Sequence, residues 1–165
     1  MILVYADHDR GELDPLALQV VSAARGLDAD VHALIVGPNA EKCVDDLASA
    51  GVRTVHHGTN AAIDDYTPRA SASAVITIME RLEPRAVLAA GTPRGSEVLA
   101  HVASIKDLPL VTECSEIALT GSGTAEVTRA RWGGNLLERS EVSADVLLAT
   151  VQAHAFAVSE DAGDA

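Results

Sequence analysis

The chain has 165 residues, nearly half of them apolar, which is enough for one domain with a substantial buried core. Its 24 acidic residues outnumber its 12 basic ones and give a formal net charge of −12, which argues against binding to nucleic acid or to an anionic membrane. No apolar run approaches the length of a membrane span, and the N-terminus enters an apolar strand at Ile2 without a basic region or a cleavage site. We therefore expect a soluble protein of the cytoplasm.

Residues 1–112 alternate short apolar runs with stretches of helical periodicity. The apolar runs predict buried strands over residues 2–6, 31–36, 53–57, 86–90 and from Leu108 onward. Helices are predicted between them, with caps at Asp14, Asn39, Thr67 and Ser96. Strands that alternate with helices pair in parallel through right-handed crossovers. The pattern predicts an α/β fold with a three-layer, doubly wound, mostly parallel sheet, of the Rossmann-like or adenine nucleotide alpha-hydrolase-like type.

The helical period disappears after residue 112. Short strands are predicted over residues 114–119, 125–131, 136–141 and 146–151, separated by glycine-rich turns that are typical of hairpins. We interpret residues 113–152 as an antiparallel β appendage on the α/β core of residues 1–112, within a single domain of residues 1–158. Residues 159–165 are acidic and small, and predict a flexible tail.

The loops after the first and fourth predicted strands are the candidate ligand site. In an open parallel sheet, ligands bind beyond the carboxyl ends of the strands, where the strand order reverses. The second loop offers an anion the Arg94 cation and backbone amides, at positions Thr92, Arg94, Gly95 and Ser96. The alternative is a glycine-rich turn in which Ser96 is only a helix cap. Asp7 and Asp9 on the facing loop would repel a phosphate, and neither a P-loop nor a GxGxxG motif is present.

Catalytic and metal-binding residues are not indicated. His56 and His57 are adjacent on a predicted strand, so their side chains point to opposite faces and do not share a metal. His8, between two aspartates, is the remaining and weaker candidate for a divalent ion. No nucleophile stands beside an evident base, and we expect no catalytic role. Cys43 and Cys114 belong to no CxxC motif, and we expect both to be small buried residues.

An ordered set of segments covers nearly the whole chain and includes the strand and acidic-histidine opening at residues 2–13, the Gly-Thr-Pro-Arg-Gly-Ser stretch from Gly91, and the sequence Arg-Trp-Gly-Gly-Asn from Arg131. This set resembles the alpha subunit of electron-transfer flavoproteins. In that family a second α/β domain holds FAD, and this sequence ends before its motifs. Gln152 and Ala153 also depart from the Arg with Gly or Pro usual at this junction.

The resemblance implies a scaffold domain without catalytic residues or a cofactor of its own. It would assemble with a beta-like subunit, with a separate flavin domain that supplies FAD, or with a second copy of itself in electron transfer. Its Arg129–Val151 segment is expected in the interface, because hairpin strands with open edges need covering. The alternatives are a stand-alone adenine-nucleotide-binding protein that uses the crevice between Asp7 and Arg94, and a self-associating structural remnant.

The acidic, lysine-poor composition suggests adaptation to high salt; the alternative is a GC-rich genome that favours Ala, Asp and Arg. If the surface is adapted to salt, self-repulsion destabilises the fold in dilute buffer and screening relieves it. We expect the melting temperature to rise clearly between dilute buffer and about 1 M KCl, where the Debye length falls to about 3 Å. A flat response in differential scanning calorimetry would leave only the genomic explanation.

Overall fold

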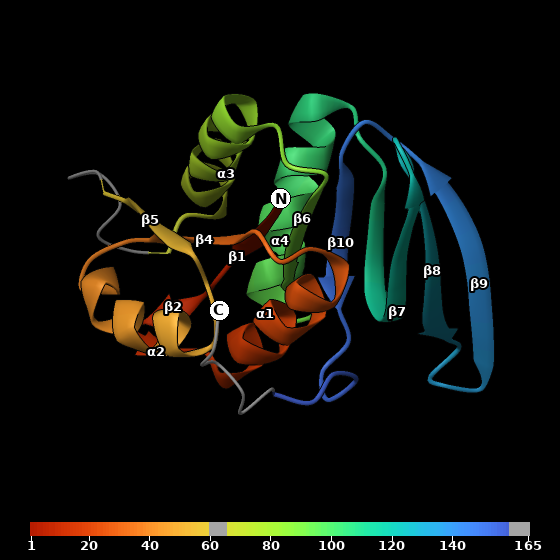
Figure 1. Ribbon diagram of the computed structural model, residues 1–165, viewed down its shortest axis with the longest axis horizontal. Helices are drawn as coiled ribbons and strands as arrows, with labels where there is room; N and C mark the ends of the chain where they lie inside the picture. Colours follow the sequence, from red (N-terminus) through yellow and green to blue (C-terminus); the bar gives the residue numbers. More distant parts are fainter. Residues whose placement is uncertain (60–65, 159–165) are drawn as a thin grey trace.

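The computed structural model describes residues 1–59 and 66–158, and one eight-stranded sheet runs through it (Figure 1). The strand order is β5-β4-β1-β6-β10-β7-β8-β9. The strands are β1 (Ile2–Tyr5), β4 (Val31–Val36), β5 (Thr54–Gly58), β6 (Ala86–Ala90), β7 (Leu110–Gly121), β8 (Thr124–Arg131), β9 (Leu136–Ser143) and β10 (Leu147–Val151). The predicted α/β class with a mostly parallel sheet is confirmed. The predicted flexible tail lies outside the described residues.

Helices cover both faces of the parallel part of the sheet. They are α1 (Pro15–Leu27), the short η1 (Ala40–Cys43) and α2 (Val44–Ser49) on one face, and α3 (Pro68–Leu82) and α4 (Pro93–Lys106) on the other. Alternate side chains of β1 point to the two sides: Ile2 and Val4 pack with α1, and Leu3 and Tyr5 pack with α3 and α4. None of the helices among the described residues is long and apolar enough to cross a membrane.

The starts of two helices follow the sequence prediction. Asp14 caps α1 by accepting a hydrogen bond from the Leu16 amide at 2.9 Å, with proline in the first turn. Thr67 is the N-cap residue of α3, again followed by proline. The predicted helix cap at Asn39 is wrong, because Asn39 has a left-handed backbone (φ 63°), its side chain makes no cap hydrogen bond, and a 3₁₀ turn follows it before α2.

The last strand differs from its predicted place in the β appendage. β10 lies inside the parallel sheet, between β6 and β7, and pairs in parallel with both. All five of its residues are buried, which explains their unbroken apolar run. The antiparallel pairs are therefore β7 with β8 and β8 with β9, which form one end of the sheet before the chain returns to its middle in β10.

A bend divides β7, for which the sequence predicts two separate strands. Glu113 has a left-handed backbone (φ 58°), and its amide donates to Thr150 Oγ1 at 2.9 Å. The first residues of β7 pair with the start of β10. Gly121, at the other end of β7, accepts a hydrogen bond from the Arg85 side chain. The Arg85 carbonyl in turn accepts a hydrogen bond from the amide of Leu147, the first residue of β10. Both ends of β7 therefore lie at the amino edge of the sheet, and the second half runs back toward it (Figure 1).

A chain of hydrogen bonds between two histidines ties the edge strand β5 to its neighbours. Arg81 of α3 donates to His56 Nδ1 at 3.2 Å, which places the His56 proton on Nε2, where it is donated to His32 Nδ1 at 3.0 Å. His32 Nε2 lies 3.5 Å from Asp30. His57 points the other way and donates to the Gly37 carbonyl at 2.9 Å, as its place on the strand predicts.

These hydrogen bonds require the His56 imidazole to be neutral. Burial, and then the neighbouring His32 and Arg81, lower the pKa of His56 below its usual value. As the pH falls, His56 therefore binds a proton in the unfolded chain before it does so in the folded protein. The contribution of neutral His56 to stability is complete above about pH 6.5 and is lost as the pH falls below that value. We expect His56→Gln, which retains a donor for His32, to flatten the dependence of the unfolding free energy on pH between about pH 7.5 and 5.

Urea unfolding followed by circular dichroism at each pH measures this dependence. The matched control is His101→Gln on α4. It leaves the hydrogen bonds of His56 intact and should keep the wild-type dependence of the unfolding free energy on pH. Equal slopes for wild type and His56→Gln would show that His56 does not link folding to pH.

Candidate functional site

The strand order reverses between β1 and β6, and the loops that follow these two strands face each other at the carboxyl edge of the sheet. They enclose a cavity of about 530 Å³ lined on one side by residues 7–9 and on the other by residues 92–94. Arg94 Nη1 lies 3.7 Å from Asp7 Oδ1 across the cavity. The crevice expected between Asp7 and Arg94 is therefore present, and the structure brings these two side chains together.

The carboxylate of Asp7 is the better buried partner of this pair. Its side chain is 14% exposed, against 42% for Arg94, and its Oδ1 accepts a hydrogen bond from the His8 amide at 3.0 Å. Burial raises the pKa of Asp7, and the Arg94 guanidinium opposes this shift. Arg94 therefore neutralises a carboxylate that is costly to bury alone.

Arg94 is also held by an aromatic ring. Its guanidinium lies 4.6 Å from the centre of the Tyr66 ring, and the Tyr66 hydroxyl donates to Glu97 at 3.0 Å. Beneath them, burial raises the pKa of Tyr5 to about 12, partly opposed by a hydrogen bond with Ser71. Arg94, which the sequence offers as the cation of an anion site, thus already contacts Asp7 and Tyr66 of its own chain.

The helix cap at this loop is Thr92, and the prediction that Ser96 caps the helix is wrong. Pro93 begins α4, because proline fits the first helical turn, where no amide partner is needed. Thr92 Oγ1 accepts the Gly95 amide at 3.0 Å, and the Thr92 carbonyl accepts the Ser96 amide at 2.9 Å. A Cβ at Gly95 would collide with the Ala90 carbonyl, which explains the glycine. Two of the amides offered to an anion are therefore used within the helix.

A small hairpin that the sequence analysis does not predict orients His8 on the other wall. β2 (His8–Asp9) and β3 (Glu12–Leu13) are joined by Arg10 and Gly11, both with positive φ, a turn signalled only by the glycine. The Gly11 amide donates to His8 Nδ1 at 3.1 Å, so Nε2 carries the proton and donates to the Val36 carbonyl at 3.1 Å. Both ring nitrogens are occupied, and no metal-binding cluster occurs among residues 1–59 and 66–158.

A second distinctive surface lies at the far end of the sheet, on the turn between β8 and β9. Trp132, Leu136 and Leu137 are 81%, 57% and 76% exposed and are the three most exposed large apolar side chains that the structure describes. Beside them, Arg129 and Arg131 both bind Glu138, at 2.7 and 2.8 Å, and lower its pKa to about 2. This turn is predicted to lie in an interface, but no sequence pattern signals how far its apolar side chains are exposed.

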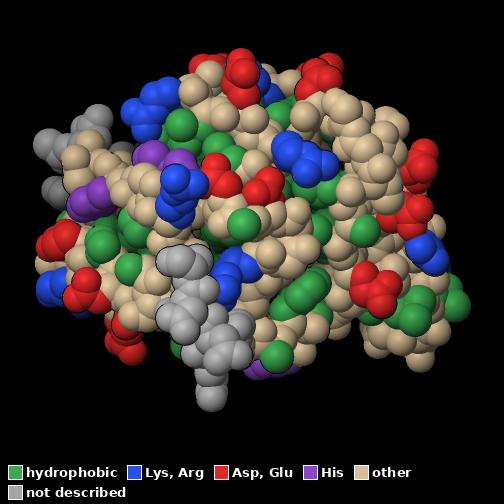
Figure 2. All heavy atoms as spheres, in the orientation of Figure 1, with side chains coloured by type: hydrophobic (Ala, Val, Ile, Leu, Met, Phe, Trp, Pro, Cys, Tyr) green, Lys and Arg blue, Asp and Glu red, His purple; other side chains and the backbone are tan. Residues whose placement is uncertain are grey.

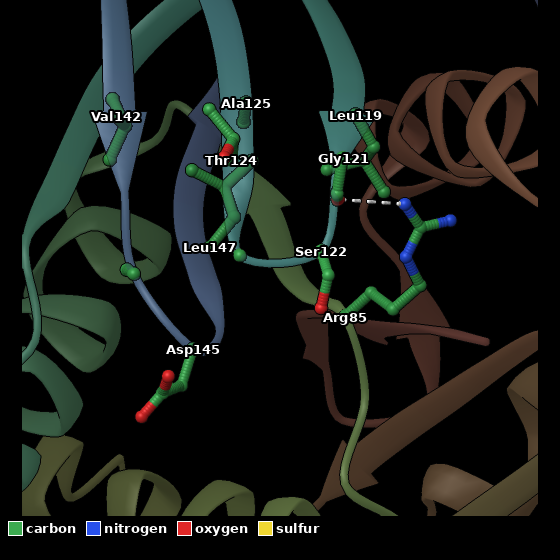
Figure 3. Close-up of a pocket in the computed structure, with 11 residues that line it drawn as sticks. Arg85, Leu119, Gly121, Ser122, Thr124, Ala125, Val142, Asp145 and Leu147 are labelled. Carbon is green, nitrogen blue, oxygen red and sulfur yellow. Dashed lines mark hydrogen bonds between the residues drawn. The ribbon is translucent and has the colours of Figure 1, made fainter.

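A separate cavity of about 350 Å³ opens at the amino edge of the sheet, by the turn between β7 and β8 (Figure 3). Its apolar lining comes from Leu119, Ala125, Val142 and Leu147. Arg85 and Asp145 stand on opposite sides of it in Figure 3, and Arg85 donates to the Gly121 carbonyl at 3.4 Å. Nothing in the sequence analysis indicates this cavity, because its walls come from three segments that only the fold brings together.

Comparison with known proteins agrees with this architecture. The family model of the electron transfer flavoprotein domain matches residues 2–165, and the chain belongs to this family. It is 29% identical over 99% of its length to the electron transfer flavoprotein subunit alpha of Pseudomonas aeruginosa, of which it covers 52%. It is 25% identical over 98% of its length to a probable mitochondrial electron transfer flavoprotein subunit alpha of Caenorhabditis elegans, of which it covers 48%. The chain thus spans about half the length of these relatives. The resemblance inferred from the sequence is confirmed.

The Thr92 cap provides a direct test of the structural role of this loop. Thr92→Val keeps the shape of the side chain but removes the acceptor for the Gly95 amide, which should lower the unfolding free energy by about 1 kcal/mol. Thr92→Ser keeps the acceptor and should stay close to wild type. Urea unfolding at neutral pH compares the three proteins. Equal stability of the valine variant would show that the cap hydrogen bond is dispensable.

Proposed function

We propose that this chain is a scaffold domain of the electron-transfer flavoprotein alpha type. It assembles with a beta-like subunit, with a separate flavin-bearing domain, or with both, and acts in electron transfer without catalytic residues of its own. The observation that supports this is the family match over residues 2–165, in a chain that covers only about half of its alpha-subunit relatives. In this proposal the flavin lies outside the 165 residues, and the assembly works in the cytoplasm.

The arrangement of the crevice favours a structural role for it. Arg94 is shared between Asp7 and the Tyr66 ring, and the amides of Gly95 and Ser96 are bonded to Thr92. An incoming phosphate would have to displace these contacts, and the carboxylates that line the cavity would oppose its charge.

The second candidate function is adenine-nucleotide binding in this crevice. The observation in its favour is the cavity of about 530 Å³ at the point where the strand order reverses, the usual ligand position of this fold. The polar groups expected to bind the nucleotide are Thr92, Arg94, Gly95 and Ser96. If they do, Arg94→Ala should weaken binding about ten- to a hundredfold, since one charged contact contributes about 1.5–3 kcal/mol.

We expect the purified chain to be colourless and to bind neither FAD nor AMP nor ATP at about 1 mM, a concentration that detects even weak sites. Visible absorption and isothermal titration calorimetry measure this. Stoichiometric absorbance of a released flavin would contradict the scaffold proposal. Heat from AMP or ATP that Arg94→Ala reduces would establish the second candidate instead.

Capture of partners from the source organism tests the positive half of the proposal. Affinity-tagged chain should retain a beta-like subunit or a flavin-bearing protein, identified by mass spectrometry and by flavin absorbance of the eluate. A chain with an unrelated fold and similar acidity serves as the control for charge-driven adsorption. Retention of neither protein would count against a role in electron transfer.

A further inference from the structure

The hairpin of β8 and β9 is electrically neutral in a strongly acidic protein. Residues 124–143 contain three arginines and three glutamates, whereas the whole chain has a net charge of −12. Two copies of the chain repel each other over most of their surfaces, and this repulsion is weakest where the hairpins meet. Figure 2 shows apolar side chains gathered at the lower right of the molecule, the end of the sheet formed by this hairpin.

β9 is also an edge strand. It pairs with β8 on one side, and no other strand of the described residues pairs with its outer side. Its backbone groups on that side are available to another strand. All eight of its residues are exposed or half-buried, and no helix of the described residues lies over this edge in Figure 1.

The sequence of β9 is complementary to itself in one antiparallel register. If two copies of β9 pair with Ser140 opposite Ser140, Arg139 of each copy stands opposite Glu141 of the other. Arg139 binds Glu126 of its own chain at 2.6 Å and keeps further N–H donors, while no ion pair among the described residues includes Glu141. The register thus supplies the missing partner of Glu141 twice, by symmetry.

The same register brings the exposed Leu136 side chain to the amino-edge cavity. Leu136 falls opposite Ala144 of the second copy, which lines that cavity, and Leu136 shares a face of the sheet with Val142, another lining residue. A cavity of about 350 Å³ has room for a leucine side chain. Trp132 lies beside Leu136, whereas Leu137, the next residue along β9, points to the opposite face of the sheet. Each copy provides one apolar projection and one cavity, as a two-fold contact requires.

We propose that the chain forms a two-fold symmetric homodimer through antiparallel pairing of β9 about Ser140, with Leu136 of each copy at the amino-edge cavity of the other. The eight-stranded sheets of the two copies become one continuous sheet. The dimer needs no flavin-bearing partner and is tested on the purified chain alone, so its failure would leave the proposed function above untouched.

Light scattering coupled to size exclusion, and analytical ultracentrifugation, measure the dimer at about 10–100 µM in about 0.2 M KCl, where surface charges are only partly screened. We expect a dimer for wild type. Arg139→Glu and Glu141→Arg each place like charges opposite one another twice, and each should raise the dissociation constant at least about tenfold. The double variant restores both opposite-charge contacts, as well as the pairing with Glu126, and should return to within about threefold of wild type.

Two further variants keep the test decisive. Arg69→Glu makes the same charge change on the exposed surface of α3, far from the hairpin, and should leave the dimer intact. Leu136→Asp should weaken it without a change in circular dichroism. A wild-type monomer at 100 µM would overturn the proposal, and so would single charge variants that remain dimeric or a double variant that is not restored. The proposal would also be overturned if the hairpin bound a different protein as a heterodimer and no homodimer formed.

Discussion

The parallel pairing of β10 with both β6 and β7 holds this protein together. Five consecutive residues from near the end of the described chain fill the middle of the sheet, and every one of their side chains is buried. A leucine or valine buried in this way stabilises the fold by about 1.5–3 kcal/mol, so Leu147 and Leu148 alone contribute a sizeable share of a typical domain's stability. β10 thus joins the two parts of the sheet, because it pairs with β6 of the parallel core on one side and with β7 on the other.

The parallel core was predictable from sequence because its signals are local. The buried strands are continuous apolar runs, and Asp14 and Thr67 precede prolines that start helices. The place of β10 was not predictable in this way, because residues 146–151 look the same whether they extend a hairpin or enter a parallel sheet. Only pairing with β6, far away in sequence, decides between the two.

The site shows the same division between local and long-range causes. That Asp7 and Arg94 meet follows from topology, and the prediction of the crevice needed nothing more. The error at Ser96 came from overlooking Pro93, a residue that marks the first turn of a helix. The stacking of Arg94 on Tyr66 depends on residues about 30 positions apart and on the packing of α3 beside α4, so no local pattern signals it. The buried polar side chains that the structure describes all have hydrogen-bond partners. The turn between β8 and β9, in contrast, exposes large apolar side chains to water.

The single tryptophan of the chain gives that turn an optical consequence. Trp132 is 81% exposed in the folded protein, so its environment changes little when the core unfolds. Its emission should be red-shifted in both states, and fluorescence would be a poor measure of folding for this domain. The same residue is a sensitive reporter of contact, because whatever covers the turn removes water from the indole and moves its emission to shorter wavelength.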